Sequence, residues 1–573
     1  MCGIVGLIGE FKESQLDAML TSQHHRGPDA TGKYFDAGFA ALGHNRLAII
    51  DLSAQSNQPF IDNSGRYVLV FNGEIYNYIE IKAALENQYD FKTESDTEVL
   101  LAAFITYGEL CLEKLNGMFS FAIWDNQEKK LFAARDRFGV KPFYYSLTNN
   151  AFYFSSEIKA LHTAGIPKVP NEKVWASYFA FGSYGNPDET FWSSIAQLPG
   201  GHFLEYKNKK LILKKWYCFE DEVAKQPKNL TFEQVKEQYV NLLKDSINLR
   251  FRADVPVGLN VSGGLDSSVL LALVNLQEDN SKINAYTFHT NNSDYDELPW
   301  VEKMISNTNN PLVKVLLQAD EIPTLSQKMA WQQDEPFGGV PTLAYAKIFE
   351  QARKDKTFVL LDGQGMDEQW AGYDYYNQNN EATIQGVHDS PYKIKMLSDT
   401  FLAKAEKPSY PKPFQDEILN KQYRDLFYTK IPRALRFNDR ISMAFSTELR
   451  EPFLDFRLVE FAFSLPLDFK IKNGISKFIL REIASEYLAD DLVFAPKRPL
   501  QTPQREWLAT DLREWVSECF EALGNSDHSA WFNKKGLENE LKSYLDGNIQ
   551  SSFHIWQCIS LYEMMEIKKN IFS

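Results

Sequence analysis

The chain of 573 residues has few cysteines, and they form no close pairs. The five are scattered along the chain: Cys2, Cys111, Cys218, Cys519 and Cys558. An odd, scattered set argues against a disulfide framework or a zinc site, so we expect a reducing, cytoplasmic compartment.

Long apolar runs are also missing. Stretches such as 269–274 are far too short to cross a bilayer, so no membrane partner is expected. The first residues, Met1 to Gly6, have neither a basic flank nor a long apolar core, and we do not expect a signal peptide there.

Basic residues are not in excess. The 61 basic and 76 acidic residues give a formal charge of −15, which argues against nucleic acid as the main partner because phosphate binding needs a clustered basic surface. The apolar content of 44% is ordinary for a folded protein, and the length requires at least two domains. We find no internal repeat. Small-molecule substrates are therefore expected.

The first 200 residues alternate between short β-rich segments and two helical stretches. Strands are predicted at 2–8, 39–50, 67–76, 120–125, 130–136, 144–146 and 152–155, and helices at 78–86 and 96–107. Strands and helices in this order favour an α+β sandwich over a regular βαβ series.

A Lys-rich, polar stretch at 207–229 is predicted to be a linker. After it, a long helix begins near Thr231, and short apolar strands at 257–261, 282–288 and 358–362 alternate with helices. That alternation indicates an α/β domain with a parallel sheet. The last 150 residues or so look helical and end in an amphipathic stretch at 552–567. The predicted domains are residues 2–206 and 228–573.

Cys2 lies directly after Met1. Once the methionine is removed, one residue carries both a nucleophilic thiol and a free α-amine with a pKa near 8 that can act as its base. Taken alone, Cys2 would be an ordinary small residue at the start of a strand. Further polar motifs follow it, at 25–29 (His-Arg-Gly-Pro-Asp), Arg46, 71–77 and 95–98.

This set closely resembles the glutaminase domain of the N-terminal-nucleophile (class II) glutamine amidotransferases, over essentially all of residues 2–200. The resemblance implies that Cys2 attacks the glutamine amide to form a thioester. It implies that the side chain of Asn72 and the backbone N–H of Gly73 form an oxyanion hole.

The same resemblance assigns the groups that hold glutamine. Arg46 would pair with the substrate α-carboxylate, and Asp96 with Glu74 would hold its α-ammonium. His25 and Arg26 are interpreted as architectural or as part of a lid, because the N-terminal amine already supplies a base.

A second motif, Asn-Val-Ser-Gly-Gly-Leu-Asp-Ser-Ser at 260–268, follows a short apolar strand and opens an apolar helix. A chance glycine turn is the plain alternative, but small and hydroxyl residues in this context let backbone amides and a helix N-terminus face an anion. The motif is not a Walker loop. It resembles the pyrophosphate loop of ATP pyrophosphatases, which implies ATP binding by Asn260, Ser262, Gly263, Gly264, Leu265, Asp266 and Ser267.

The segment 362–373 matches a second part of that family. The resemblance implies that Asp266 and Asp367 hold Mg²⁺, and that backbone groups of Asp362 and Gly363 lie near the nucleotide. Lys477 matches the lysine that stabilises charge as ammonia attacks an acyl-adenylate. The plain alternatives are a solvated acidic face for Asp367 and an isolated surface lysine for Lys477.

A glutaminase followed by an ATP pyrophosphatase is the order found in the glutamine-hydrolysing asparagine synthetases, and the resemblance covers nearly the whole chain. It implies an N-terminal-nucleophile sandwich, an α/β ATP-pyrophosphatase domain with a helical C-terminal part, and conversion of glutamine, ATP and aspartate to asparagine, glutamate, AMP and pyrophosphate. An internal ammonia tunnel and a homodimer are further expectations from the family.

The residues expected near the carboxylate acceptor differ from the usual family sequence, most clearly at Gln364, where the family has a glutamate. Glutamine keeps the size and hydrogen bonding but cannot act as a base. The acceptor therefore stays open between aspartate and another carboxylate, such as an acidic sugar of a surface polysaccharide. A β-lactam-forming relative fits poorly because Cys2 is present. A non-catalytic sensor fits poorly because Asp266 and Asp367 are present as well.

Overall fold

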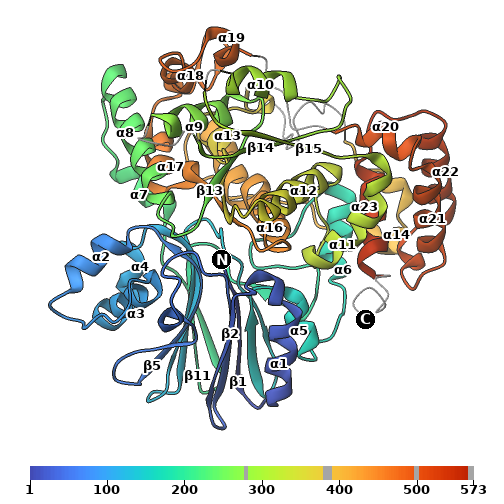
Figure 1. Ribbon diagram of the computed structural model, residues 1–573. Coiled ribbons are helices and arrows are strands. Elements are labelled where there is room, and N and C mark those ends of the chain that lie inside the picture. The colour runs from blue at the N-terminus through green and yellow to red at the C-terminus, as the bar shows by residue number, and fades with distance from the viewer. Residues whose placement is uncertain (277–281, 307, 378–389, 496–501, 566–573) are drawn as a thin grey trace.

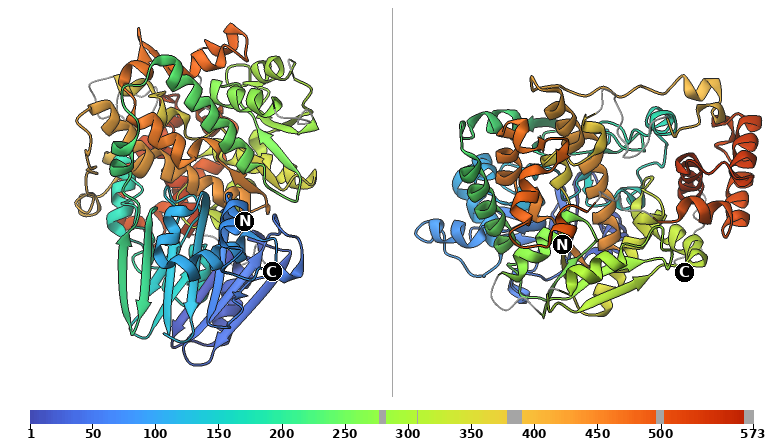
Figure 2. Two further views of the ribbon diagram at one scale, coloured as in Figure 1. Left: turned by 90° about the vertical axis from the view of Figure 1, so that its left-hand side faces the viewer. Right: turned by 90° about the horizontal axis from the view of Figure 1, so that it is seen from above.

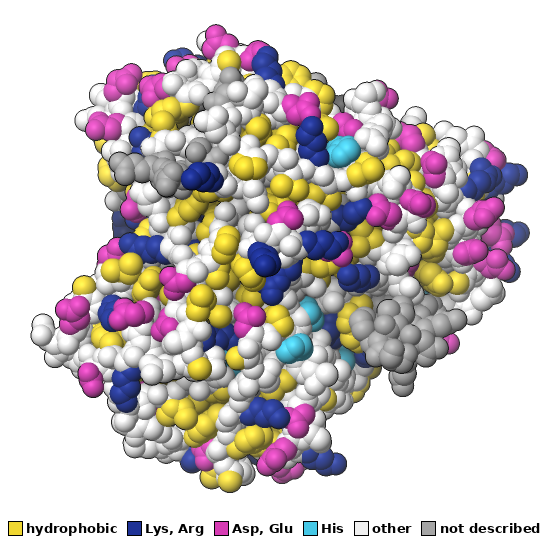
Figure 3. Space-filling view, viewed as in Figure 1, with side chains coloured by type: hydrophobic (Ala, Val, Ile, Leu, Met, Phe, Trp, Pro, Cys, Tyr) yellow, Lys and Arg dark blue, Asp and Glu magenta, His cyan; other side chains and the backbone are white. Residues whose placement is uncertain are grey.

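The computed structural model describes residues 1–276, 282–306, 308–377, 390–495 and 502–565. Figure 1 shows a sheet-rich half built from the N-terminal residues, below a larger half in which helices surround another sheet. No helix of the described ranges is both long and apolar enough to span a membrane. Figure 3 shows acidic and basic side chains interspersed over one face of the molecule.

The N-terminal half consists of two antiparallel sheets packed face to face. The first has the order β10-β8-β9-β1-β3-β2, and the second β12-β11-β7-β6-β5-β4. The strands are β1 (Gly3–Gly9), β2 (Ala30–Asp36), β3 (Ala40–Arg46), β4 (Phe60–Ile61), β5 (Tyr67–Ile75), β6 (Gly117–Asp125), β7 (Lys130–Arg135), β8 (Tyr144–Leu147), β9 (Ala151–Ser155), β10 (Ala196–Gln197), β11 (His202–Lys207) and β12 (Lys210–Lys215).

Helices cover the outer faces of these sheets. Two of them, α1 and α5, lie on the first sheet, and α2 and α3 lie on the second (Figure 1). Their apolar faces complete separate cores on the two sides of the sandwich. The helices are α1 (Glu13–Ser22), α2 (Tyr78–Leu85), α3 (Asp96–Tyr107), α4 (Cys111–Lys114), α5 (Ile158–Thr163) and α6 (Glu172–Phe181). This arrangement confirms the predicted α+β sandwich.

The second half is built on a five-stranded parallel sheet of order β15-β14-β13-β16-β17. Its strands are β13 (Val257–Asn260), β14 (Ala285–His289), β15 (Leu312–Leu316), β16 (Val359–Leu361) and β17 (Glu448–Arg450), and a small ribbon is formed by β18 (Ile471–Lys472) and β19 (Ile475–Ser476). All five parallel strands are short, as is usual where both sheet faces are covered by helices. The predicted α/β domain is confirmed.

Helices make up most of the rest of this half. They are α7 (Phe219–Lys225), α8 (Phe232–Arg250), α9 (Leu265–Asn275), α10 (Leu298–Ile305), α11 (Ile322–Gln333), α12 (Val340–Lys354), α13 (Met366–Gln369), α14 (Asp399–Leu402), α15 (Glu417–Arg424), α16 (Lys430–Met443), α17 (Phe456–Ser464), α18 (Phe478–Ala484), α19 (Asp490–Val493), α20 (Gln504–Ala509), α21 (Arg513–Gly524), α22 (Lys534–Leu545) and α23 (Phe553–Met565). The predicted helical C-terminal part is thereby confirmed; residues 566 and 567 of the predicted last helix lie outside the described residues.

The prediction of a linker over 207–229 is wrong for most of its length. Strand β12 pairs with β11 at the edge of the second sheet, and α7 packs against α17. The lysine-rich composition suggested a linker because β12 is an exposed edge strand, and charged side chains on such a strand face solvent. The sequence analysis also missed β2, β4, β10, β11, β15, β17, β18 and β19, and most of these strands have only two to five residues.

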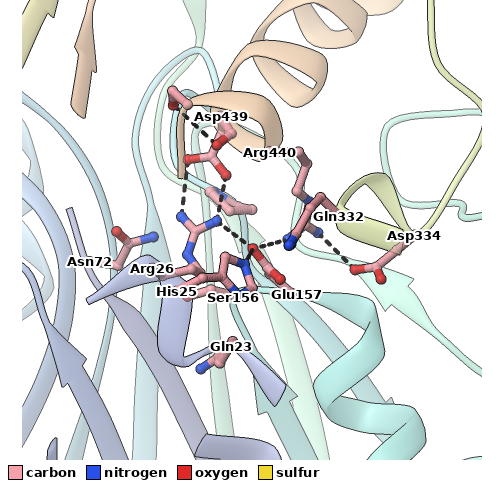
Figure 4. Close-up of polar contacts among 12 residues, drawn as sticks. Gln23, His25, Arg26, Asn72, Ser156, Glu157, Gln332, Asp334, Asp439 and Arg440 are labelled. Atoms are coloured by element: carbon pink, nitrogen blue, oxygen red, sulfur yellow. Dashed lines mark hydrogen bonds and ion pairs between the residues drawn. The ribbon is translucent and has the colours of Figure 1, made fainter. Parts of the chain in front are cut away.

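The two halves are joined by buried ion pairs around Arg26. Its guanidinium donates to Asp439 of α16 at 2.8 and 3.1 Å and to Glu157 at 2.9 Å, and its Nε donates to the Cys2 carbonyl at 3.0 Å. Arg440 of α16 lies 3.1 Å from the same Glu157 carboxylate. Figure 4 shows this group between the two halves. Such a network holds its members in fixed positions, because an unpaired charge there would be costly.

The N-terminus itself is part of this junction. The Met1 ammonium lies 2.8 Å from Glu448 of β17, and both groups are fully buried. Met1, Leu47, Tyr76 and Met118 share one apolar core with residues of the second half. In Figures 1 and 2 the N-terminus accordingly lies in the middle of the molecule.

We predict that Asp439→Ala lowers the thermal unfolding midpoint strongly. The substitution leaves Arg26 and Arg440 buried with one carboxylate fewer, which costs roughly 3 kcal/mol on the scale measured for broken buried pairs. Differential scanning calorimetry checks this. Glu417→Ala, which removes the exposed pair with Lys412, serves as the control and should leave the midpoint unchanged. Equal midpoints for the two variants would contradict the role given to the Arg26 network.

Candidate functional site

Cys2 lies just before β1, the strand between β3 and β9, and is 7% exposed. Its Sγ lies 3.9 Å from the Leu47 carbonyl, and its backbone N–H donates to Asn72 Oδ1 at 2.9 Å. Burial raises the pKa of the Cys2 thiol, and the nearby terminal ammonium and Arg46 lower it. In this structure the terminal ammonium belongs to Met1, so Cys2 carries a free amine only once Met1 is removed.

Strand β5 brings Asn72 and Gly73 against Cys2. Asn72 is fully buried, and its Nδ2 has no hydrogen-bond acceptor among the described residues, which leaves one fixed amide donor beside Cys2. A side chain at Gly73 would meet the Met118 carbonyl at 2.1 Å, so only glycine allows β5 to approach β6 this closely.

Arg46, at the end of β3, has its guanidinium held by oxygen atoms that carry no formal charge. Nη1 donates to the Ser53 carbonyl at 2.7 Å and to Asn57 Oδ1 at 2.8 Å, and Nη2 donates to the Asp51 carbonyl. No carboxylate forms an ion pair with Arg46 among the described residues. The guanidinium is therefore oriented while its charge is left for an anionic ligand.

Two carboxylates, Glu74 on β5 and Asp96 at the start of α3, lie near each other. Asp96 accepts a hydrogen bond from the Ile75 N–H at 2.9 Å, and Glu74 lies 3.6 Å from the Arg450 guanidinium. Burial raises the pKa of Asp96 to about 6, and burial with the nearby Glu448 raises that of Glu74. Such a site favours a bound cation, because a positive charge would stabilise both ionised carboxylates.

The segment containing His25 and Arg26 is architectural. Arg26 is fully buried and bonded to both halves, and the Ser446 hydroxyl donates to the His25 carbonyl at 2.6 Å. These contacts favour the first of the two interpretations made from the sequence over a lid.

The second site lies where β13 ends and α9 begins. Ser267 Oγ donates to the Ser262 carbonyl at 2.6 Å and accepts from the Ser262 N–H at 3.2 Å, which closes the loop. Gly264 is the N-cap of α9, and a side chain at Gly263 would meet Trp300 Cβ at 2.7 Å, so the loop backbone packs closely against α10. A helix N-terminus preceded by such a loop is suited to bind phosphate.

Lys477, Asp266 and Asp367 meet beside this loop. The Lys477 Nζ lies 2.6 Å from Asp266 and 2.7 Å from Asp367. Burial alone would lower the pKa of Lys477, but the two carboxylates raise it above its usual value. A side chain at Gly372 would meet Asp367 Oδ1 at 1.9 Å and Lys477 Cε at 2.3 Å, so glycine is needed for the three groups to assemble.

Asp266 and Asp367 are the two carboxylates that a magnesium ion could share. No cluster of three or more His, Cys, Asp or Glu side chains able to hold a metal occurs in the described parts of the chain. Two carboxylates fit magnesium nonetheless, because this ion keeps several waters and takes its remaining ligands from phosphate oxygens.

A cavity of about 160 Å³ joins the loop to these groups. Its lining includes Ser262, Gly263, Gly264, Asp266, Asp367 and Lys477, and also three residues that sequence reasoning missed, Trp300, Ser476 and Arg481. Arg481 could have been found four residues after Lys477, because Lys477 is the N-cap of α18 and Arg481 lies in the first turns of that helix.

Asn260, Asp362 and Gly363 also come together, at the carboxyl ends of the neighbouring strands β13 and β16. Asn260 Nδ2 donates to Asp362 Oδ2 at 3.3 Å, and the Gly363 N–H donates to Asp362 Oδ1 at 2.6 Å. Burial raises the pKa of Asp362 to about 6. Gln364 follows them and accepts a hydrogen bond from Asn438 of α16 at 2.9 Å. Ligands commonly bind at this edge of a parallel sheet.

Comparison with protein families agrees with this division of the chain. Residues 1–217 match the model of a glutamine amidotransferase domain, and residues 238–567 match the model named asparagine synthase. The second match alone covers more than half of the 573 residues.

Similar proteins extend over the whole length. The glutamine-hydrolysing asparagine synthetase 1 of Bacillus subtilis is 27% identical over 97% of this chain and 95% of its own. A putative asparagine synthetase 2 of Methanocaldococcus jannaschii is 34% identical over 65% of this chain and 76% of its own. A protein of Gibberella zeae named amidase chry2 is 27% identical over 90% of this chain and 91% of its own.

The fold, the two groups of residues and these matches agree. The chain belongs to the asparagine synthase family and carries a glutamine amidotransferase domain at residues 1–217.

Proposed function

We propose that this protein transfers the amide nitrogen of glutamine to the side-chain carboxylate of aspartate, with ATP activating the carboxylate as an acyl-adenylate. One observation carries the proposal: a buried thiol beside an unpaired amide donor, and a lysine between two carboxylates beside a phosphate loop, lie in one molecule joined by buried ion pairs. The first group can release ammonia, and the second can form an electrophile that ammonia attacks.

In the first step, the Cys2 sulfur attacks the glutamine amide carbon and the free Cys2 amine takes the thiol proton. The resulting oxyanion lies against Asn72 Nδ2 and the Gly73 N–H, which are fixed before the charge develops. The leaving nitrogen accepts the proton and departs as ammonia, and water then hydrolyses the thioester to glutamate. Arg46 holds the α-carboxylate, and Glu74 with Asp96 holds the α-ammonium.

In the second step, the loop from Ser262 to Ser267 holds the pyrophosphate part of ATP. Asp266 and Asp367 would hold a magnesium ion, whose positive charge would neutralise negative charge on the leaving pyrophosphate. Lys477 stabilises the negative charge that builds on the acyl oxygen during attack by ammonia. In the present structure its ammonium neutralises the two carboxylates in place of another cation.

A different carboxylate acceptor is the second candidate, and Gln364 is the observation that favours it. Its side chain is fixed by Asn438 in the region that would face the acceptor, where the family resemblance leads one to expect a glutamate. An acidic sugar would present the same reacting carboxylate with a different body.

The function is tested by incubating the purified protein with glutamine, Mg-ATP and aspartate and following asparagine and AMP by mass spectrometry. Asparagine formed in equal amount to AMP supports the proposal. Glutamate without asparagine or AMP would reject aspartate as the acceptor, and the same assay with uronic acids would then test the second candidate.

We predict that Cys2→Ala abolishes glutamine-dependent synthesis, by at least about a thousandfold, because no other nucleophile can form the thioester. Synthesis from added ammonium should continue at nearly the normal rate, since the second site is untouched. Cys218→Ala, which alters a cysteine away from both groups, is the matched control. Loss of the ammonium-dependent reaction in a folded Cys2→Ala protein would contradict the division into two sites.

A second prediction concerns Asp266→Asn. AMP formation should fall at least about a hundredfold, the scale expected when one fixed charge-stabilising group is lost, and should need more magnesium. Glutamate release should persist. The exposed Asp546 after α22 provides the control substitution, Asp546→Asn. Unchanged AMP formation at low magnesium in Asp266→Asn would refute the assignment of this carboxylate to the metal.

A further inference from the structure

A small polar cavity lies at the junction of the two halves. It has a volume of about 20 Å³, enough for one water-sized molecule. Tyr76, Met118 and Arg137 line it from the N-terminal half, and Arg250, Glu451 and Leu454 from the other. Tyr76 directly follows β5, the strand that carries Asn72 and Gly73. The cavity therefore begins next to the site where ammonia would be released.

Glu451 is a buried carboxylate without a partner. Its residue is 5% exposed, and none of the described residues forms a hydrogen bond or ion pair with its side chain. Lys141, in the N-terminal half, is 1% exposed, and its side chain likewise forms no hydrogen bond or ion pair with the described residues. Among the charged groups, Lys141 influences Glu451 most strongly. Buried charges are normally paired directly, so a carboxylate that lines the cavity without a partner among the described residues indicates a polar group that belongs in the cavity.

Other polar atoms of the lining residues also lack partners. The Tyr76 hydroxyl, Arg137 Nε and Arg250 Nε are buried and accept or donate no hydrogen bond within the described residues. A small molecule that both donates and accepts hydrogen bonds would satisfy several of these groups together.

The far side of the cavity reaches the acceptor region. Strands β16 and β17 are parallel neighbours, and Asp362 and Glu451 are the residues that directly follow them. The Asp362 N–H donates to the Arg450 carbonyl at 2.9 Å. A side chain at Gly365 would meet Leu454 at 2.6 Å, so the loop that carries Gln364 packs directly on the segment that carries Glu451. A carboxylate is thus present beside this loop, although position 364 itself has none.

Resting on the proposed function, we propose that this cavity receives the transferred nitrogen and that Glu451 is its proton acceptor, supplying the buried carboxylate that Gln364 does not. Ammonia that takes up a proton from water after its release becomes ammonium. In the cavity one N–H bond of this ammonium breaks, the proton joins a Glu451 oxygen, and the electron pair stays on nitrogen. The products are ammonia, which can attack, and a neutral carboxylic acid.

The charges facing Glu451 come from several elements. They are Lys141 and Arg250, which favour its ionised form, Asp362 and Asp439, which oppose it, and Asp136 and Arg137 at the cavity wall. Burial is the largest influence and raises the pKa of Glu451 to about 8. The carboxylate is therefore a stronger base than a solvent-exposed glutamate, and it is increasingly ionised as the pH rises through about 8.

The test compares wild type with Glu451→Gln, measuring glutamate release and amide product together from about pH 6.5 to about pH 9. We expect glutamate release to be unchanged and amide formation to fall about a hundredfold, the scale of a lost general base. In wild type the amide formed per glutamate should rise through about pH 8, and in E451Q this rise should disappear. An unchanged product ratio and pH profile in E451Q would overturn the proposal.

A compensating variant makes the test specific. Adding Gln364→Glu to E451Q returns a carboxylate to the same region and should restore at least about a tenth of the amide formation. Glu460→Gln is the matched control, because Glu460 is a buried carboxylate that is already bonded, to the Tyr217 hydroxyl at 2.8 Å. A similar loss in E460Q, or no rescue by Gln364→Glu, would mean that Glu451 acts only through packing.

Two further readings keep the outcomes separate. If E451Q also loses glutamate release, Glu451→Asp is tested in its place, because this variant keeps a carboxylate. The amide formed per glutamate should then still rise with pH. Loss of that rise in the Glu451→Asp variant would reject the proposal. If wild type itself forms no amide from any carboxylate tested, the proposed function fails, and the failure is seen before any Glu451 variant is compared.

Discussion

The buried ion pairs around Arg26 are the contact on which the rest of the structure depends. Arg26 bonds to the backbone of Cys2 on one side and to Asp439 of α16 on the other, and the residue before Asp439 holds Gln364. Cys2 and the loop that carries Gln364 are therefore fixed to the same buried group. Removing one charge from this group would leave another unpaired in a dry interior, which is why the two halves cannot shift independently at low cost.

The candidate site residues lie at the edges of two sheets, and the buried ion pairs around Arg26 hold these sheets together. Strand β5 carries Asn72, Gly73 and Glu74 past the start of β1, and the parallel sheet ends its strands β13, β16 and β17 side by side. Close approach matters more than any one hydrogen bond in both places, since Gly73 and Gly372 lie where a single added carbon would collide with its neighbours. The cavity with Glu451 lies between these two edges.

Several elements of the fold and of the candidate sites could be predicted from the sequence, because short local motifs determine them. The strand-rich first half and the strand–loop–helix at 257–275 follow from short segments with strong turn and helix signals. The grouping of Asp266 with Asp367 was expected only from the resemblance to the ATP pyrophosphatases. The lysine-rich edge strand β12 was mistaken for a linker because its pattern reflects solvent exposure, not pairing. Contacts between distant segments were out of reach: Arg26 and Asp439 are 413 residues apart. Glu451 gave no signal of its own, since an unpaired buried carboxylate looks like any other glutamate until its surroundings are known.

The proposed function requires that nitrogen passes from Cys2 to the acceptor inside the molecule. The most direct measurement supplies glutamine labelled with ¹⁵N at the amide together with an excess of unlabelled ammonium and reads the isotope in the amide product by mass spectrometry. Under conditions in which glutamine saturates, the account predicts a product that keeps nearly all of the ¹⁵N. A product diluted to the isotope ratio of the surrounding ammonium would contradict it, because the nitrogen would then have left the protein before it reacted.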